Sequence, residues 1–332
     1  MKKIPFFFIL FTIAIFFSSC FSRTETLKPK VSGKAGELLL VMPERNWISE
    51  PGSTFREILT TDKNGLPQPE PLFSLIHVIP DQFAKIFNSH RNIILVSIGP
   101  ENEKNKISVQ QDLWSTPQIV INIKAESDEA CKELLNKNSD YLIDRINRAE
   151  QERVLMNYRK FMEAGIVQSI KMKHHINLVI PKGYRLDVDS TNFVWLASET
   201  PTSSQGILIY FFPYTDENTF TPEYLVEKRD MFLKKYVPGP SPNTWMATED
   251  LLPPGFKEFE LDGKYYSELR GLWKLQNGFM GGPFVSLSTV DELRNRVVTV
   301  EGFVYAPGEK KRELLRQVES ILFTLTIDEP ED

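Results

Sequence analysis

Apolar residues in the first half of the chain fall into short runs separated by amphipathic segments. Residues 37–42 and 92–98 are nearly uninterrupted apolar runs, which is typical of strands buried on both faces. Residues 118–124 alternate apolar and polar positions, which predicts a strand with one buried face. A helical pattern at 53–60 lies between the first two runs. This order of elements predicts an α/β domain with a mixed sheet over residues 36–172.

The longest helical pattern begins after Ser127. Ser127 is a suitable N-cap, and the two acidic residues that follow it favour the positive end of the helix dipole. Apolar residues continue at helical spacing as far as Met162. A continuous helix over 127–162 would be about 54 Å long at 1.5 Å per residue, longer than a small domain. We therefore expect a break, a protruding end, or a helix that bridges both halves of the chain.

The second half predicts strands in series, closed by helices. The strands are predicted at 176–180, 193–198, 206–213, 256–261, 264–273, 284–290 and 296–305. Asp262-Gly263 is a strong hairpin signal between two of them. Helices are predicted after Thr221, which precedes a proline, and after Pro307-Gly308. This order predicts a helix-covered antiparallel sheet over residues 173–328, and the chain as a whole is predicted to be α+β.

The amino-terminal residues carry an export signal. Two lysines precede an apolar run of roughly 14 residues, too short to span a bilayer but suited to a secretory signal peptide over residues 1–19. Ser18-Ser19-Cys20 resembles the lipobox of bacterial lipoproteins. The resemblance implies a lipid on Cys20, cleavage before it, and a tether over residues 20–35. A plain secretion signal with a chance cysteine is the alternative.

Composition excludes some partners. The formal net charge of the 332 residues is −5, so the body of the protein has no bulk attraction for nucleic acid. The chain has two cysteines, and a lipid on Cys20 would leave Cys131 without a disulfide partner. Cys131 lies in the first turn of a predicted helix, where it is either a reactive thiol or, as we favour, a packed small residue.

No motif for catalysis or cofactor binding stands out. His77, His90, His174 and His175 are the only histidines, and none has a second ligand at metal spacing. The chain has no nucleophile elbow and no phosphate-binding loop. We predict no metal and no cofactor, and His77 is expected to be a satisfied core or edge histidine.

Residues 269–284 form the strongest candidate surface for a ligand or partner. The candidate residues are Arg270, Trp273, Phe279, Met280, Gly281 and Gly282. We predict that Arg270 anchors an anionic group and that Trp273 or Phe279 supplies an apolar wall, although strand alternation puts Arg270 and Trp273 on opposite faces. The two glycines form either a structural turn, which we favour, or part of a binding loop.

Several sequence blocks together carry a resemblance to a known family. The blocks are residues 33–37, 91–96, 192–196, 270–273, 280–284 and 303–307. They resemble an uncharacterised lipoprotein family of Bacteroidota, domain of unknown function 4837, over nearly all of the mature chain. The resemblance implies an envelope location and no assigned activity. The second half is also loosely similar, in element order alone, to the sandwich of PsbP and Mog1.

These observations lead to one expectation and one alternative. We expect a periplasm-facing, lipid-anchored protein, on the outer membrane, that acts as a binding or accessory module for an envelope protein complex or a cell-wall or lipid-linked ligand. The alternative is an envelope hydrolase or transferase whose active site is assembled from distant positions. A deep pocket with two convergent acids, or an acid with a histidine, would favour the enzyme; a flat apolar patch rimmed with charge would favour the binding module.

Overall fold

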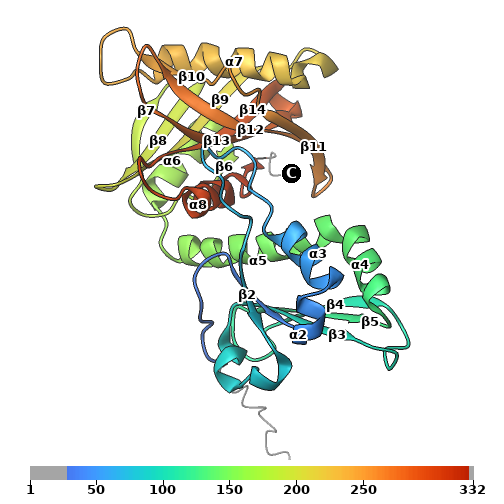
Figure 1. The fold of residues 1–332 in the computed structure, drawn as a ribbon. Coiled ribbons are helices and arrows are strands. Elements are labelled where there is room, and N and C mark those ends of the chain that lie inside the picture. The colour runs from blue at the N-terminus through green and yellow to red at the C-terminus, as the bar shows by residue number, and fades with distance from the viewer. Residues whose placement is uncertain (1–27, 329–332) are drawn as a thin grey trace, which may run out of the picture.

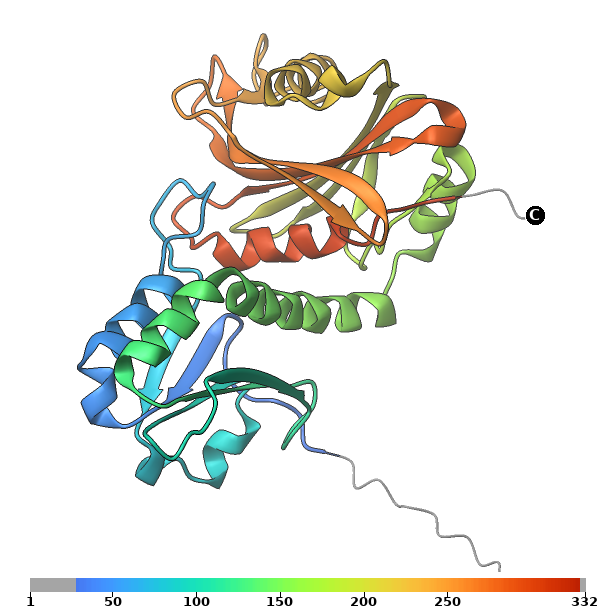
Figure 2. The same cartoon turned by 90° about the vertical axis from the view of Figure 1, so that its right-hand side faces the viewer.

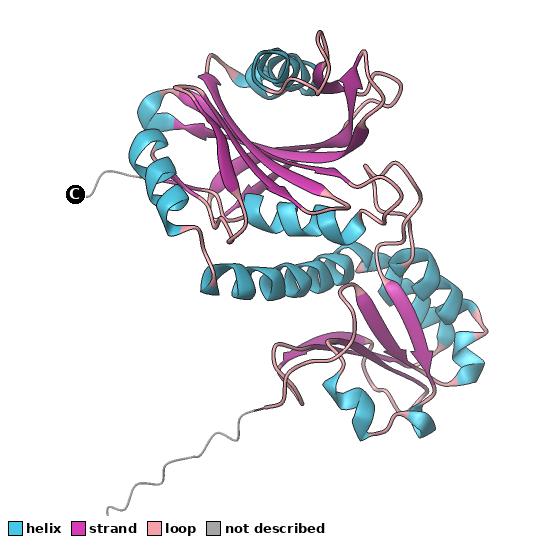
Figure 3. Ribbon diagram, turned by 90° about the vertical axis from the view of Figure 1, so that its left-hand side faces the viewer, coloured by secondary structure: helices cyan, strands magenta, loops and turns pink. Residues whose placement is uncertain are grey.

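The computed structural model describes residues 28–328, so the predicted signal peptide and Cys20 lie outside the described residues. The described chain forms two halves, each built on its own sheet (Figure 1). A layer of helices separates the two sheets (Figure 3). Helices α5 (Ser139–Lys160) and α8 (Arg312–Leu322) lie side by side in this layer (Figure 2).

The N-terminal half contains a five-stranded mixed sheet, as the apolar pattern predicted. Its strands are β1 (Glu37–Val41), β2 (Ser74–Val78), β3 (Asn92–Ile98), β4 (Lys106–Gln111) and β5 (Ile119–Ala125), in the order β2-β1-β3-β5-β4. All neighbours are parallel except β4, which pairs antiparallel with β5. The short helix α2 (Glu44–Trp47) and helices α3 (Glu50–Leu59), α4 (Asp128–Lys137) and α5 complete the helical part of this half. One apolar core joins the sheet to α3, α4 and α5.

The predicted 127–162 helix is broken, which is one of the outcomes that its length suggested. The Ser127 hydroxyl accepts a hydrogen bond from the backbone N–H of Ala130, as expected for an N-cap. Asn138 ends α4, and its side-chain amide donates to the carbonyl of Leu134 at 2.7 Å. Helix α5 then begins at Ser139. Helix α5 packs on the N-terminal core and also contacts α8 of the other half.

Helix α6 (Ala164–His174) was not predicted from the sequence, so the prediction for these residues is corrected. Gly165 near its start disfavours a helix in isolation, but Ile170 is buried in the core of the C-terminal half. His174 and His175 therefore end a helix rather than enter a strand, and His175 has a left-handed backbone. The strand expected at 176–180 is only the two-residue β6 (Ile176–Asn177), which pairs with β15 (Thr326–Ile327).

The C-terminal half contains the predicted antiparallel sheet. Its strands are β7 (Arg185–Asp189), β8 (Phe193–Glu199), β9 (Ser204–Pro213), β10 (Trp245–Thr248), β11 (Gly255–Leu261), β12 (Lys264–Gln276), β13 (Gly281–Asp291) and β14 (Arg296–Tyr305). The order is β10-β12-β13-β14-β9-β8-β7, with β11 also pairing with β12. Asp262 and Gly263 both have positive φ, as the predicted two-residue hairpin requires. The sequence missed the short strands β7 and β10.

Helices cover both faces of this sheet. Helix α7 (Pro222–Tyr236) packs on one face over an aromatic core, and α8 packs on the other with α6. Four 3-10 turns complete the described elements: Pro80–Gln82, Lys85–Ser89, Glu217–Phe220 and Glu292–Arg294. Between residues 28 and 328, no helix combines the length and the apolar character needed to cross a membrane.

Buried polar contacts join the two halves. The loop at 61–71 extends from the N-terminal half to the start of α8 (Figure 1). The carboxylate of Glu70 accepts hydrogen bonds from the backbone N–H groups of Lys311 (2.7 Å) and Arg312 (3.2 Å). The Arg312 guanidinium donates to the carbonyl of Pro71 at 2.7 Å. An acid of one half thus satisfies the free N–H groups at the positive end of a helix in the other.

Candidate functional site

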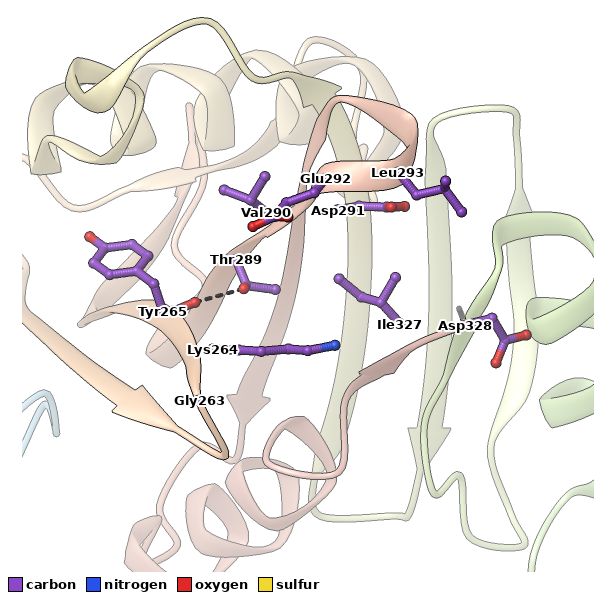
Figure 4. Close-up of a pocket in the computed structure, with 10 residues that line it drawn as sticks. All are labelled: Gly263, Lys264, Tyr265, Thr289, Val290, Asp291, Glu292, Leu293, Ile327 and Asp328. Carbon is purple, nitrogen blue, oxygen red and sulfur yellow. Dashed lines mark hydrogen bonds between the residues drawn. The ribbon is translucent and has the colours of Figure 1, made fainter. Parts of the chain in front are cut away.

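One cavity, about 740 Å³, lies where β12 and β13 meet the last described residues (Figure 4). Lys264 extends into it, and the hydroxyl of Thr289 donates to the carbonyl of Tyr265 at 2.7 Å. Asp291 is buried and already ion-paired with Arg294 (3.2 Å) and Arg296 (2.9 Å). The buried acid of this cavity is therefore neutralised by two arginines.

A second cavity, about 490 Å³, opens between the two halves, and we call it the central cleft. Its walls are the polar face of α5, the β11–β12 hairpin, one side of α8, and the loop that carries Lys63. The lining residues are Lys63, Asp144, Asn147, Arg148, Gln151, Lys257, Phe259, Glu260, Leu261, Asp262, Glu268, Arg270, Arg316, Glu319 and Phe323. Both halves therefore build this site, and neither half forms it alone.

An ion-paired cluster lies at the base of the cleft. Glu319 on α8 accepts a hydrogen bond from Lys63 at 2.8 Å and pairs with Arg270 on β12, which also donates to Glu268 at 3.2 Å. Burial raises the pKa of Glu319, but the charges of Arg270 and Lys63 outweigh burial and lower it to about 2. Glu319 is therefore ionised at neutral pH and is unsuited to proton transfer, which needs a pKa near the working pH.

Arg316, one turn before Glu319, is the least satisfied charge in the cleft. Its side chain is 2% exposed, yet its guanidinium donates no hydrogen bond to any residue of the described chain. Its nearest acid is Glu313, 3.3 Å away, which already accepts a hydrogen bond from Arg312 at 2.8 Å. The Phe73 ring centre lies 5.9 Å from the guanidinium carbon, a weak compensation.

The surroundings of Arg316 are positively charged. Burial lowers the pKa of Lys63; Glu319 opposes this shift, and the charges of Arg270 and Arg316 add to it. Burial also lowers the pKa of Arg153 to about 10, again with a contribution from Arg316. Arg148 faces the same cleft from α5 and has no ion-pair partner among residues 28–328. The inner part of the cleft therefore favours a negatively charged group.

The rest of the lining is apolar inside and acidic outside. Phe259, Leu261 and Phe323 are partly buried against the C-terminal core, and the two rings lie 6.2 Å apart. The acids Asp144, Glu260 and Asp262 are exposed at the mouth and outnumber the two exposed cations there, Arg148 and Lys257. The cleft thus combines a cationic interior, an apolar wall and an acidic rim.

The structure places only Arg270 of the predicted surface in this cleft. Trp273 lies on the opposite face of the sheet, 3% exposed, and its indole N–H donates to the carbonyl of Val304 at 3.2 Å. Phe279 is fully exposed in the turn between β12 and β13. The expectation that Trp273 or Phe279 forms a wall beside Arg270 is therefore corrected, because strand alternation and strand length separate them.

The predicted glycine turn belongs to strand β13. Gly281 and Gly282 both lie in the strand, and neither has positive φ. A Cβ on Gly282 would lie 2.0 Å from the carbonyl oxygen of Val304, so glycine is needed there for close approach of the backbone. Met280 is partly buried against the aromatic core under α7. These three residues therefore support the packing of the sheet and line no part of the central cleft.

The other predicted chemical residues occupy structural positions. Cys131 is fully buried, and burial, with Asp128, raises the pKa of its thiol to about 12, so it is a packed residue rather than a reactive thiol. His77 is satisfied, with Nε2 2.9 Å from the carbonyl oxygen of Met42. Within the described range, no three His, Cys, Asp or Glu side chains are placed to hold a metal ion.

Sequence reasoning missed Lys63, Arg148 and Arg316. Of these three, only Arg316 could have been suspected of burial from the sequence, because it lies beside the apolar stripe of a strongly amphipathic helix. That position becomes buried only when the other half covers α8, which the pattern of a single helix does not reveal.

Comparison with known families finds one match for each half of the chain. Residues 163–324 match the model described as Domain of unknown function (DUF4837), and residues 31–159 match Domain of unknown function (DUF8532). Each half therefore resembles a domain of unknown function. The DUF4837 resemblance is therefore confirmed for the second half, whereas its expected extension over nearly all of the mature chain is corrected by the separate match of the first half. No curated protein matches the chain.

Three solved structures have a distant likeness to this chain. LpqN, described as involved in cell envelope biogenesis of Mycobacterium tuberculosis, is 15% identical, covers 46% of this chain and 83% of its own, and gives a TM-score of 0.29. The human StarD13 (DLC2) lipid transfer and protein localization domain is 10% identical, with 48% and 94% covered and a TM-score of 0.23. Human STARD10 is 8% identical, with 42% and 73% covered and a TM-score of 0.22. These scores are too low to establish a shared fold.

Proposed function

We propose that this chain is a lipid-anchored protein of the cell envelope that binds a small ligand in the central cleft. The observation that carries the binding proposal is Arg316, a buried guanidinium with no hydrogen bond within the described chain, in a cavity of about 490 Å³. That volume falls in the usual range for small-molecule sites. Buried charges ordinarily have hydrogen-bond partners, so this side chain fits a site whose partner arrives from outside.

The chemistry of the cleft supports binding over catalysis. Glu268 and Glu319 both pair with Arg270, and none of the lining residues is a histidine. The depressed pKa of Glu319 keeps it ionised, so it is a poor general acid at neutral pH. The unpaired acids of the lining, Asp144, Glu260 and Asp262, are all exposed, so the buried part of the cleft lacks the free pair of acids that would favour the hydrolase or transferase.

The proposed location rests on the sequence. Ser18-Ser19-Cys20 closes a short apolar run, and the following tether has no run of acidic residues. We therefore propose an anchor on the periplasmic side of the outer membrane, with a cell-wall or lipid-linked molecule, or an envelope protein that presents one, as the source of the ligand. Two or more acyl chains would hold the protein stably without a transmembrane helix.

The anchor is tested by following a clickable fatty acid into the protein. We expect the wild-type chain to incorporate the label and its first peptide to begin at an acylated Cys20, whereas Cys20→Ala incorporates none. Mass spectrometry of the amino-terminal peptide reads both results. An unmodified wild-type peptide would remove the anchor from the proposal.

Ligand binding is tested on protein extracted from the membranes of the cells that make it. We expect native mass spectrometry to show an added small-molecule mass that denaturing spectra lack. The added mass should be retained by Arg159→Gln, a substitution at an exposed position of α5 that does not line the cleft. Equal native and denatured masses in the wild type would contradict a bound ligand.

A further inference from the structure

We propose that the central cleft recognises a single oxyanion, carboxylate or phosphate, on a small amphipathic molecule, with Arg316 as the group that binds it. This inference rests on the proposed function, because it names the ligand class of the same cleft. It assigns Arg316 to the oxyanion, the pair Phe259 and Phe323 to the apolar part, and Arg148 to the entrance.

Arg316 is a buried cation with hydrogen-bond donors that are not used. A guanidinium has five N–H donors in a planar fork that matches a carboxylate or phosphate. The Arg316 side chain is only 2% exposed, and its Nη1 has no hydrogen-bond partner. A buried charge without hydrogen bonds destabilises a fold. Such a residue is explained when binding, rather than stability, requires it.

The charged groups around Arg316 also favour an anionic ligand. Lys63 and Arg316 lie close enough that the charge of Arg316 helps to lower the pKa of Lys63. Glu319 is shared between Lys63 and Arg270, and Glu313 is shared between Arg312 and Arg316. The one acid within ion-pair distance of Arg316 is therefore shared with Arg312, and a ligand oxyanion would supply the missing partner.

The charged residues at the mouth of the cleft limit the total charge of the ligand. Asp144, Glu260 and Asp262 line the exposed rim of the cleft, where they would repel a multiply charged anion. Arg148 on α5 and Lys257 on β11 are two exposed cations of the same lining, and they offset the three acids only in part. The cleft therefore favours a monoanion or a zwitterion over a polyanion such as a nucleotide.

The apolar wall defines the other end of the ligand. Phe259 and Phe323 have their ring centres 6.2 Å apart, and Leu261 lies beside them in the same lining. Both rings are only partly buried. An apolar group that covers them would bury surface that is now wet, which favours binding.

The test uses two probes that differ by one charge. 8-Anilino-1-naphthalenesulfonate carries a sulfonate on the same ring system as the neutral N-phenyl-1-naphthylamine. We expect the wild-type protein to bind the sulfonate more tightly, and Arg316→Met to weaken sulfonate binding about tenfold or more, the usual effect of losing a charged hydrogen bond. Binding of the neutral probe should change less than twofold.

Two further variants bracket the effect. Arg148→Gln is expected to weaken sulfonate binding by two- to fivefold because it lies at the entrance, and Arg159→Gln, outside the cleft on the same helix, should leave it unchanged. Displacement of the sulfonate probe by dodecanoate or by dodecyl phosphate then distinguishes a carboxylate ligand from a phosphate ligand.

The outcomes separate the inference from the proposed function. Equal affinity of both probes for the wild type, or unchanged sulfonate binding by Arg316→Met, would overturn the oxyanion inference while leaving a ligand cleft in place. Failure of both probes to bind, together with no added mass in the native spectra, would overturn the binding function itself. Tighter displacement by adenosine triphosphate than by the monoanion dodecanoate would contradict the role assigned to the acidic rim.

Discussion

Replacing Glu301 by Gln is expected to lower the free energy of unfolding by about 3–5 kcal/mol, the usual cost of breaking a buried ion pair from one side. Glu301 on β14 and Arg229 on α7 are both fully buried. The guanidinium donates to the two carboxylate oxygens at 2.9 and 2.7 Å, and it stacks on Phe284 at 3.7 Å. The variant leaves a permanent charge in an aromatic core, since arginine does not deprotonate.

Removing the arginine instead should cost less. Burial raises the pKa of Glu301, and the charge of Arg229 opposes that shift. In Arg229→Met the opposition is gone, so Glu301 can bind a proton and become neutral. A carboxyl whose pKa is higher in the folded than in the unfolded state makes the protein less stable as pH rises from the unfolded value to the folded one. The free energy of unfolding of this variant should therefore be highest at low pH and fall as pH rises above 4.5.

Urea unfolding of Glu301→Gln, Arg229→Met and the double variant measures these effects. Glu199→Gln is the matched control, because Glu199 pairs with Arg185 at 3.1 Å on the exposed surface and its loss should not be measurable. Equal losses for Glu301→Gln and Glu199→Gln would mean that the buried pair does not hold α7 on the sheet.

Replacing Glu319 by Gln is the second change with a large expected effect, about 3–5 kcal/mol. Glu319 is buried between Lys63 of the N-terminal half and Arg270 of the C-terminal half. In the variant, Lys63 loses its ion-pair partner, whereas Arg270 still pairs with Glu268. Because the cluster spans the two halves, we also expect the unfolding transition of the variant to become less cooperative.

The pH dependence of this loss follows from the pKa of Glu319. Its carboxyl has a folded pKa of about 2 against an ordinary value of 4.5. A lowered pKa stabilises the fold above the unfolded value and stops doing so as pH falls through the folded one. That difference corresponds to about 3 kcal/mol. The gap between wild type and Glu319→Gln should therefore be full at pH 7 and shrink between pH 4.5 and pH 2.

Urea titrations at pH 7, 4 and 2.5 measure the gap. Glu309→Gln serves as the control just before the same helix, since Glu309 is exposed and forms no ion pair within the described residues. A gap between wild type and Glu319→Gln that stays constant from pH 7 to pH 2.5 would show that the carboxylate is not held ionised by Lys63 and Arg270.

The sequence predicted elements wherever one periodicity dominates. The continuous runs of β1 and β3 and the Asp262-Gly263 turn are local signals, and the structure confirms them. Helix α6 was missed because its stabilising contact is tertiary: Ile170 is buried against the core of the other sheet. The short strands β7 and β10 were missed because four or five residues give too few alternations to be distinguished from loop.

The candidate site was predictable only in part. Arg270 was identified, and alternation along β12 already separated it from Trp273. The cleft itself requires α5 and the 61–71 loop to meet α8, and these segments are far apart in sequence. The amphipathic pattern of α8 hints that Arg316 is buried, but nothing local shows that its Nη1 is buried without a hydrogen bond, which is the property on which the site depends.

The central claim is that Arg316 serves binding at the expense of stability. It is tested most directly by measuring, on purified Arg316→Met, both the free energy of unfolding in urea and the affinity for 8-anilino-1-naphthalenesulfonate. The account predicts an unfolding free energy equal to or above that of the wild type, since a buried charge without hydrogen bonds is removed and Glu313 keeps Arg312, together with about a tenfold loss of affinity. A loss of more than about 2 kcal/mol of stability with unchanged affinity would contradict it, because Arg316 would then be a structural residue.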